Sequence, residues 1–244
     1  MAYDTTADII ATAAVMCGLS SVANPYSSSD DAQIQLRTLL NQCGRELYAL
    51  HQWQQFVKTH SFSTGASPVS TGLYDLPSDF GYFINQTGWD TTNQVPLGGP
   101  VTEQQYALLV STDLATTTVY VSFSLANMKI RVLPAPAPAN TTITFQYMSN
   151  GWVYEAGDTT TRTTKADEAD DVVMFEPVLI TTMLALRYKQ AKGLPAKDLL
   201  EQFQAQLSLF TGVNAPAPVL SMAGCGGFPY INPWSNLPNT GYGS

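Results

Sequence analysis

Few side chains in this 244-residue sequence could carry out covalent chemistry. His51 and His60 are its two histidines, and Cys17, Cys43 and Cys225 are its three cysteines. A serine or cysteine nucleophile needs a neighbouring base, and no pattern here brings one to a histidine. An odd number of widely spaced cysteines predicts neither a disulfide framework nor a zinc site. We therefore expect structural histidines, Cys17 and Cys43 in the core, and no catalytic residue, cofactor or bound metal.

Three carboxylates come closest to the pair that a glycosidase requires. Asp75 and Asp79 flank a Leu-Pro-Ser turn, and Glu103 follows a loop rich in glycine and proline. A glycosidase holds its two carboxyl groups at a fixed separation, which nothing in this spacing enforces. The simpler interpretation places Asp79 in a turn before Phe80, and Glu103 in the first turn of a helix. The motifs GxxxxGK[ST], HExxH, GxSxG and CxxC are absent from the sequence.

A second acidic group consists of Asp167, Glu168, Asp170 and Asp171. These side chains could bind a cation. A calcium loop, however, would need alternating oxygen ligands, a glycine and a terminal glutamate, which this segment lacks. We expect instead a solvated acidic linker that runs into the start of a helix.

The charge composition limits the classes of partner. Charged residues make up 12% of the chain, about half the usual share, and the net charge is −8. A surface that grips phosphates needs clustered lysine and arginine, so no such surface is expected. A weakly charged surface suits a protein that packs against copies of itself. Asp4 and Asp8 stand where a signal peptide would have basic residues, and no apolar stretch has the length of a membrane span.

Hydrophobic spacing predicts helices near both ends of the chain. Near the N-terminus we expect one helix, capped by Thr5 or Thr6, that ends before Gly18. A long helix, capped by Ser29 or Asp30, is expected to follow and to continue to Val57. Near the C-terminus, one helix is predicted from residues 170–171 to Gly193, with Pro177 in its first turns. Another is predicted from Pro195 to Gly212.

Residues 58–154 instead show the short alternating segments of β-strands, rich in threonine and aromatics and separated by turns. Segments 116–125 and 128–133 predict a hairpin with a two-residue turn at 126–127. Residues 101–111 predict the one helix within this stretch. We expect it to form a compact antiparallel sandwich or barrel.

The predicted fold class is α+β, with four parts along the chain. Residues 1–57 and the helices of 155–211, which follow the acidic linker, are expected to form one helical bundle. Residues 58–154 form an inserted antiparallel β sandwich or barrel-like domain. Residues 212–244 form an extended C-terminal arm.

The C-terminal arm is unusual because no charged residue follows Glu201. Free disordered tails are normally charged and poor in aromatics. This arm carries aromatic anchors between prolines and glycines, which favours docking in grooves of another subunit; the alternative is a loose tail or a loop packed on its own domain. The candidate subunit or portal interface residues are Phe228, Tyr230, Trp234 and Tyr242.

The order of several short motifs resembles a known family. Trp53-Gln-Gln-Phe56 is followed by Tyr74-Asp75-Leu76-Pro77-Ser78-Asp79-Phe80, then by MKIRVLPAPAPANTTITFQYMSNGWV, and finally by VVMFEPVLITTMLALRYKQAKGLPAKDLLEQF. In this order they resemble the head-to-tail adaptor proteins of tailed bacteriophages, of the connector or tail tubular protein A type, over about residues 5–211.

The resemblance implies a structural virion protein with no enzymatic activity. Such adaptors gather helices from both chain halves around an inserted β domain. They form a ring, usually of twelve copies, beneath the portal protein and above the next tail or nozzle protein. Genomic DNA passes through the ring without sequence-specific binding, and a bore that repels phosphate suits that passage. No membrane contact is implied. The protein would assemble in the host bacterial cytoplasm and reside at the head–tail junction of the virion.

Two alternatives remain open. One is another phage tail component, such as a fibre-attachment or baseplate-like protein, since these share a threonine-rich β composition. The other is an entry-associated glycan hydrolase, which would depend on the carboxylates and the aromatic residues.

Overall fold

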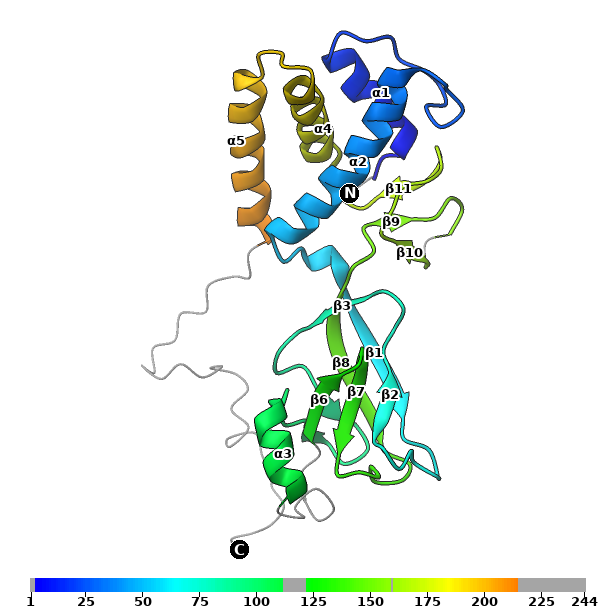
Figure 1. Cartoon of the computed structure of the whole chain (residues 1–244), viewed down its shortest axis with the longest axis vertical. Helices are drawn as coiled ribbons and strands as arrows, with labels where there is room; N and C mark the ends of the chain where they lie inside the picture. The colour runs from blue at the N-terminus through cyan, green and yellow to red at the C-terminus, as the bar shows by residue number, and fades with distance from the viewer. Residues whose placement is uncertain (1–2, 112–121, 159, 215–244) are drawn as a thin grey trace, which may run out of the picture.

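The computed structural model describes residues 3–111, 122–158 and 160–214. Figure 1 shows an elongated molecule with most helices gathered at one end and most strands, with one helix, at the other, joined by a narrow waist. We call these ends the helical lobe (3–56 and 150–214) and the β lobe (57–149). The mixture of helices with antiparallel sheets agrees with the predicted α+β class.

The first helix, α1 (Thr6–Met16), lies where the sequence predicts it. The Thr5 hydroxyl accepts a hydrogen bond from the Asp8 amide at 3.2 Å and so caps the N-terminus. Gly18 follows the helix at φ +76°, a left-handed conformation that glycine adopts without strain. Asp30 caps the next helix in the same way as Thr5.

That helix, α2 (Asp31–Leu50), is shorter than predicted, and its expected continuation to Val57 is wrong. The Trp53 indole N–H donates to the Leu47 carbonyl at 2.7 Å, so the ring folds back under the last turn. It takes a carbonyl that another turn of helix would have used. A 3₁₀ turn, η1 (Gln54–Phe56), then leads into the first strand.

The predicted start of the third terminal helix at residues 170–171 is also wrong. α4 (Pro177–Ala191) begins at Pro177, whose fixed φ and missing N–H suit a first helical position. The preceding residues form β11 (Val172–Val173), which pairs with β9 (Val153–Tyr154) and belongs to a small sheet with β10 (Arg162–Thr163).

The last helix, α5 (Lys197–Asn214), does not stop at Gly212 as predicted. Gly193 does end α4, at φ +67°. Figure 1 shows α5 packed beside α4. α4 is buried along its whole middle, because α1, α2 and α5 all pack against it.

One hydrophobic core joins helices from both ends of the chain. Its largest members are aromatic rings near the waist, which pack edge-on or tilted at 5.2–6.1 Å between centroids. The principal buried residues of this core are Ile9, Ile10, Leu36, Leu40, Leu47, Trp53, Phe56, Trp152, Phe175, Leu179, Ile180, Leu184 and Phe203.

The β lobe is built on a long antiparallel pair. β1 (Val57–Ser63) pairs with β8 (Thr142–Ser149) without a break, from Val57↔Met148 to Ser63↔Thr142. The other edge of β8 pairs with β3 (Phe80–Phe83) and β4 (Trp89–Asp90), and β4 pairs with β5 (Val95–Pro96). Because β1 and β8 run through the waist, the chain enters and leaves the β lobe at adjacent points (Figure 1).

A second antiparallel sheet has the order β2 (Leu73–Asp75), β7 (Lys129–Leu133), β6 (Ser122–Ala126). The helix α3 (Glu103–Ser111) lies in the predicted place and starts with reciprocal hydrogen bonds between Thr102 and Gln105. The two sheets share one core, formed by Phe80, Phe123, Ile130, Val132, Ile143, Phe145 and Tyr147.

The predicted hairpin is present, but its turn lies one residue later than expected. Ala126 pairs with Lys129, so the turn residues are Asn127 and Met128 instead of residues 126–127. Both have positive φ, 54° and 57°, as in a type I′ turn. The first half of the predicted first strand, 116–121, lies outside the described residues.

Candidate functional site

The histidines occupy structural positions, as expected. The His51 ring packs edge-on against Trp53 at 5.3 Å, and the His60 ring lies 5.4 Å from Phe145. Burial lowers the pKa of His60, although the charge of Asp79 opposes the shift. Among the residues that the structure describes, neither ring is hydrogen-bonded to a serine or cysteine.

Cys17 and Cys43 lie against the helical core, also as expected. The Cys17 thiol lies 3.7 Å from the Ala185 carbonyl. Burial raises the pKa of Cys43 to about 12, so this thiol is not poised as a nucleophile at neutral pH.

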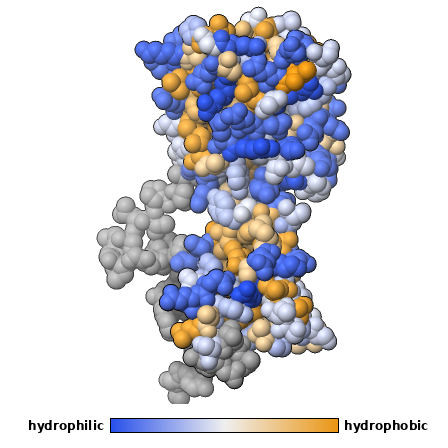
Figure 2. All heavy atoms as spheres, viewed as in Figure 1, coloured by the Kyte–Doolittle hydropathy of each residue, from blue (hydrophilic) through white to orange (hydrophobic). Residues whose placement is uncertain are grey.

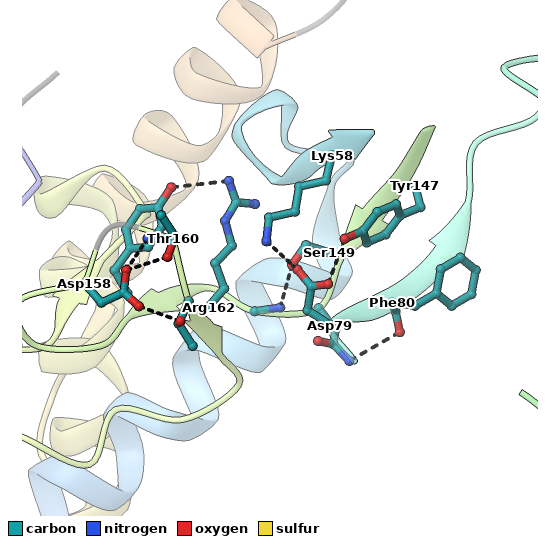
Figure 3. A network of polar contacts seen from close by, with 12 residues as sticks. Lys58, Asp79, Phe80, Tyr147, Ser149, Asp158, Thr160 and Arg162 are labelled. Atoms are coloured by element: carbon teal, nitrogen blue, oxygen red, sulfur yellow. Dashed lines mark hydrogen bonds and ion pairs between the residues drawn. The ribbon is translucent and has the colours of Figure 1, made fainter. Parts of the chain in front are cut away.

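The most connected polar group lies at the waist, where the carboxylate of Asp79 accepts three side-chain hydrogen bonds. Lys58 Nζ and Ser149 Oγ donate to Oδ2 at 2.7 and 2.8 Å, and the Tyr147 hydroxyl donates to Oδ1 at 2.7 Å. Figure 3 shows these side chains converging on Asp79 from β1 and β8. The Asn150 amide adds a bond to the Asp79 carbonyl at 2.9 Å. We call this network the waist clamp.

The waist clamp keeps Asp79 ionised. Burial alone would raise the pKa of this carboxyl, but the hydrogen bonds from Lys58, Tyr147 and Ser149 outweigh it and hold the pKa below its ordinary value. A carboxylate that already accepts these bonds is a poor base. The clamp ties three separate chain segments together, so its role is structural.

The other two candidate carboxylates belong to separate ion pairs. Asp75 contacts Lys129 at 2.7 Å, and Glu103 lies 3.7 Å from Arg131. Both acids are largely exposed, whereas the Asp79 side chain is 14% exposed. The three carboxylates therefore have different partners, and none of these contacts pairs two of them for glycosidic chemistry.

The prediction that the acidic linker is solvated is wrong for Asp171. Asp171 is buried, and its carboxylate accepts backbone N–H bonds from Ala156, Asp167 and Glu168 at 3.2, 2.8 and 2.9 Å. These bonds fold the segment that ends at Asp171 back on itself. The segment is followed by the strand β11 and not by a helix. Within the described ranges, no group of acids, histidines or cysteines is arranged to hold a metal ion.

A neighbouring turn is organised in a similar way but at the surface. The Asp158 carboxylate accepts hydrogen bonds from the Thr160 amide and hydroxyl and from the Thr161 hydroxyl, and these bonds lower its pKa. Figure 3 also shows Arg162 beside this turn, with a bond to the Tyr154 hydroxyl at 3.3 Å. Both acidic turns therefore shape the backbone next to the waist.

The apolar surface of the β lobe suggests contacts with other proteins, not catalysis. Figure 2 shows apolar surface on the β lobe directly below the waist. No helix in the described part of the chain is long and apolar enough to cross a membrane. The predicted interface residues Phe228, Tyr230, Trp234 and Tyr242 lie outside the described residues, as does Cys225.

Comparison with protein families identifies the family of this chain. A family model described as SU10 adaptor protein matches residues 4–219, which is most of the chain. The chain belongs to the SU10 adaptor protein family. This confirms the resemblance to phage head-to-tail adaptors. A search of curated proteins gave no match.

Membership makes this adaptor a structural phage protein, a virion component of the head–tail junction that assembles with other head and tail proteins. Its best-built polar feature is the waist clamp, which sequence reasoning missed. The sequence predicts Asp79 as a turn residue. Its partner Lys58 lies 21 residues away in the sequence, and the contact between them depends on strand register. The only sequence signal was the Leu-Pro-Ser-Asp-Phe turn itself.

Proposed function

We propose that this adaptor forms a ring beneath the portal, joins the capsid to the tail and surrounds the path of the genome. Twelve copies are the usual number in the adaptors that it resembles. The observation that carries this proposal is the family match over residues 4–219.

The way in which the two lobes are joined supports the proposal. A closed ring requires every subunit to present the same angle between its contact surfaces. The waist clamp and the unbroken β1–β8 pair hold the waist end of the β lobe together. This end is joined to the helical lobe by Met148, which is buried in the helical core, and by the bond from the Asn150 amide to the Asp79 carbonyl. We infer that the chain has a helical domain interrupted by an inserted β domain, and that the joint between them is rigid.

The charge balance supports a conduit. With 19 acidic and 11 basic residues, the subunit repels DNA phosphates on average. Repulsion lets a duplex slide, whereas a basic bore would hold it. The genome is thus a passing partner with no sequence-specific contacts.

The C-terminal arm is the proposed link to a neighbour. It follows α5, continues without charge to residue 244, and contains Phe228, Tyr230, Trp234 and Tyr242. We propose that these rings anchor the arm on an adjacent subunit or an adjoining ring. A buried aromatic side chain contributes roughly 2–3 kcal/mol, enough in sum to offset part of the ordering cost of an extended chain.

The test is assembly of the purified full chain with the portal protein of the same phage, followed by mass photometry. We expect a ring of many copies bound to the portal. A trimer that does not bind the portal protein would instead favour a fibre-type component. Turnover of peptidoglycan in a zymogram, lost on Glu103→Gln, would revive the hydrolase alternative.

A further inference from the structure

The strand β1 leaves one edge of its sheet open. Thr64, just after β1, donates its backbone N–H to the Thr141 carbonyl at 2.9 Å, and the two strands pair in register from there to the waist. In an antiparallel pair, alternate residues bond to the partner strand, and the residues between them point the other way. The backbone N–H and C=O groups of Thr59, Ser61 and Ser63 therefore point away from β8.

No strand in the described part of the chain bonds to this edge. β1 is the end strand of its sheet and, with seven residues, the longest strand at a sheet edge within the described ranges. β2 follows it in the sequence and lies beside it (Figure 1), with the Phe62 and Tyr74 rings 4.9 Å apart between centroids, yet β2 pairs with β7. The edge strand β6, in contrast, bonds through Phe123 to Gly98 and Val101.

The β1 edge also lacks the features by which natural proteins prevent pairing with another chain. Such features are charges, prolines and bulges along the edge strand. Residues 59–63 include no acidic residue, lysine, arginine or proline, and the pairing of β1 with β8 has no register shift. The charged residue of β1, Lys58, is held by Asp79 in the waist clamp. A long edge without these features is suited to accept an added strand.

The C-terminal arm contains a segment that suits this edge. Residues 219–228 are the longest stretch of the arm without proline, and residues 219–225 read Val-Leu-Ser-Met-Ala-Gly-Cys. Proline lacks the N–H that a strand ladder needs, so this stretch is the part of the arm best able to pair along the whole of β1. Neither residues 219–225 nor residues 59–63 carry a lysine, arginine or acidic residue, so their pairing buries no such charge.

The place where the arm begins fits a contact between copies. α5 ends near the waist, where β1 begins (Figure 1). Copies in a ring are related by rotation, so the arm of one copy starts level with the first residues of β1 in the next. Residues 215–218, Ala-Pro-Ala-Pro, favour an extended spacer between α5 and the pairing segment.

We propose that residues 219–225 of each copy add as a strand to the free edge of β1 in the next copy of the ring. Backbone hydrogen bonds along the edge would supply the affinity, as in other cases of strand addition. This inference rests on the ring of the proposed function and gives the first part of the arm a defined docking site.

The first test uses Cys225, at the end of the segment, as a built-in probe. Thr59→Cys and Ser63→Cys place a thiol near either end of the β1 edge, so one of them lies near Cys225 whichever way the segment runs. The matched control is Gln104→Cys, at an exposed position in α3. After assembly with portal protein and treatment with a short bis-maleimide, one β1 variant should link chains into multimers at least about tenfold more than the control, because docking raises the local thiol concentration. Adding Cys225→Ser should abolish these links.

The outcomes of this test separate the inference from the proposed function. Rings that form without such cross-links, or cross-links confined to single chains, would overturn the inference and leave the proposed function intact. A wild-type chain that stays monomeric even with portal protein would contradict both.

The second test removes hydrogen-bond donors from the arm. Ser221→Pro combined with Met222→Pro deletes two successive N–H groups, one of which points toward β1 in any register. We expect an unchanged Tm of the isolated subunit and, by mass photometry with portal protein, at least about a tenfold higher concentration for half-assembly. The matched control, Asn239→Pro combined with Thr240→Pro, should assemble as the wild type does. Equal assembly of the two variants, or a lower Tm of the first alone, would overturn the inference.

Discussion

At the scale of single residues, Asp79 is the shared acceptor on which the waist clamp depends. Replacing it by asparagine leaves Lys58 without its charged partner and weakens two further hydrogen bonds. We expect Asp79→Asn to lower the free energy of unfolding by about 2 kcal/mol, measured by urea denaturation at pH 7. The control is Asp75→Asn, whose carboxylate is 84% exposed and should contribute less than about 0.5 kcal/mol. Equal effects of the two substitutions would contradict a structural role for the clamp.

The pH dependence of the same residue has a defined sign. Because the folded-state pKa of Asp79 lies below its ordinary value of 3.8, its stabilisation is complete above that value and is lost as the pH falls through the folded pKa. The difference in unfolding free energy between wild type and Asp79→Asn should therefore be constant from pH 7 to about 5 and shrink below pH 4. A difference that grows toward acid would show that the carboxylate is not stabilised in the folded state.

At the scale of elements, two helical glycines should respond in opposite ways. A Cβ at Gly44 in α2 would lie 2.4–2.6 Å from the Trp152 ring, which is itself buried, whereas one at Gly212 in α5 would meet nothing within 4 Å. We expect Gly44→Ala to destabilise the subunit by about 1–3 kcal/mol, because the overlap exceeds the gain in helix propensity. Gly212→Ala should be neutral or stabilise by up to about 1 kcal/mol. Thermal unfolding followed by circular dichroism measures both, and a stabilised Gly44→Ala would refute the close packing of α2 on Trp152.

Elements whose boundaries depend on local signals could be predicted from the sequence. The caps at Thr5 and Asp30, the stop at Gly18 and the start of α3 all rest on neighbours within four residues. The end of α2 could not be predicted, because the apolar spacing continues through Trp53 to Val57, whereas the Trp53 ring turns back on Leu47.

The same distinction explains what was missed near the waist. Residues 170–176 carry helix-like charges and apolar spacing, yet strand pairing and the backbone bonds to Asp171 decide their structure. The contact of Lys58 with Asp79 and the place of Met128 in the hairpin turn both depend on strand register. Register is a tertiary property that composition and spacing do not specify.

At the scale of the whole molecule, the arm and the folded subunit should be separable. In the described part of the chain, the cores of both lobes are formed by residues that precede the end of α5. Truncation after Asn214 should therefore leave Tm within about 2 °C of wild type, since both of these cores are retained. The truncated chain should fail to bind portal protein or form rings, as judged by co-sedimentation. Substituting serine for Phe228, Tyr230 and Trp234 in the full chain should reproduce that loss, and normal assembly of either variant would exclude the arm as an anchor.

The central claim is that this chain is the ring that joins the portal to the tail. A cryo-electron reconstruction of the head–tail vertex of the virion tests it most directly, because copy number, neighbours and position all follow from one map. We expect copies of this chain to form a ring around the genome path, between the portal and the tail. Density for this chain at a tail fibre or baseplate, or its absence from the portal–tail boundary, would contradict the account.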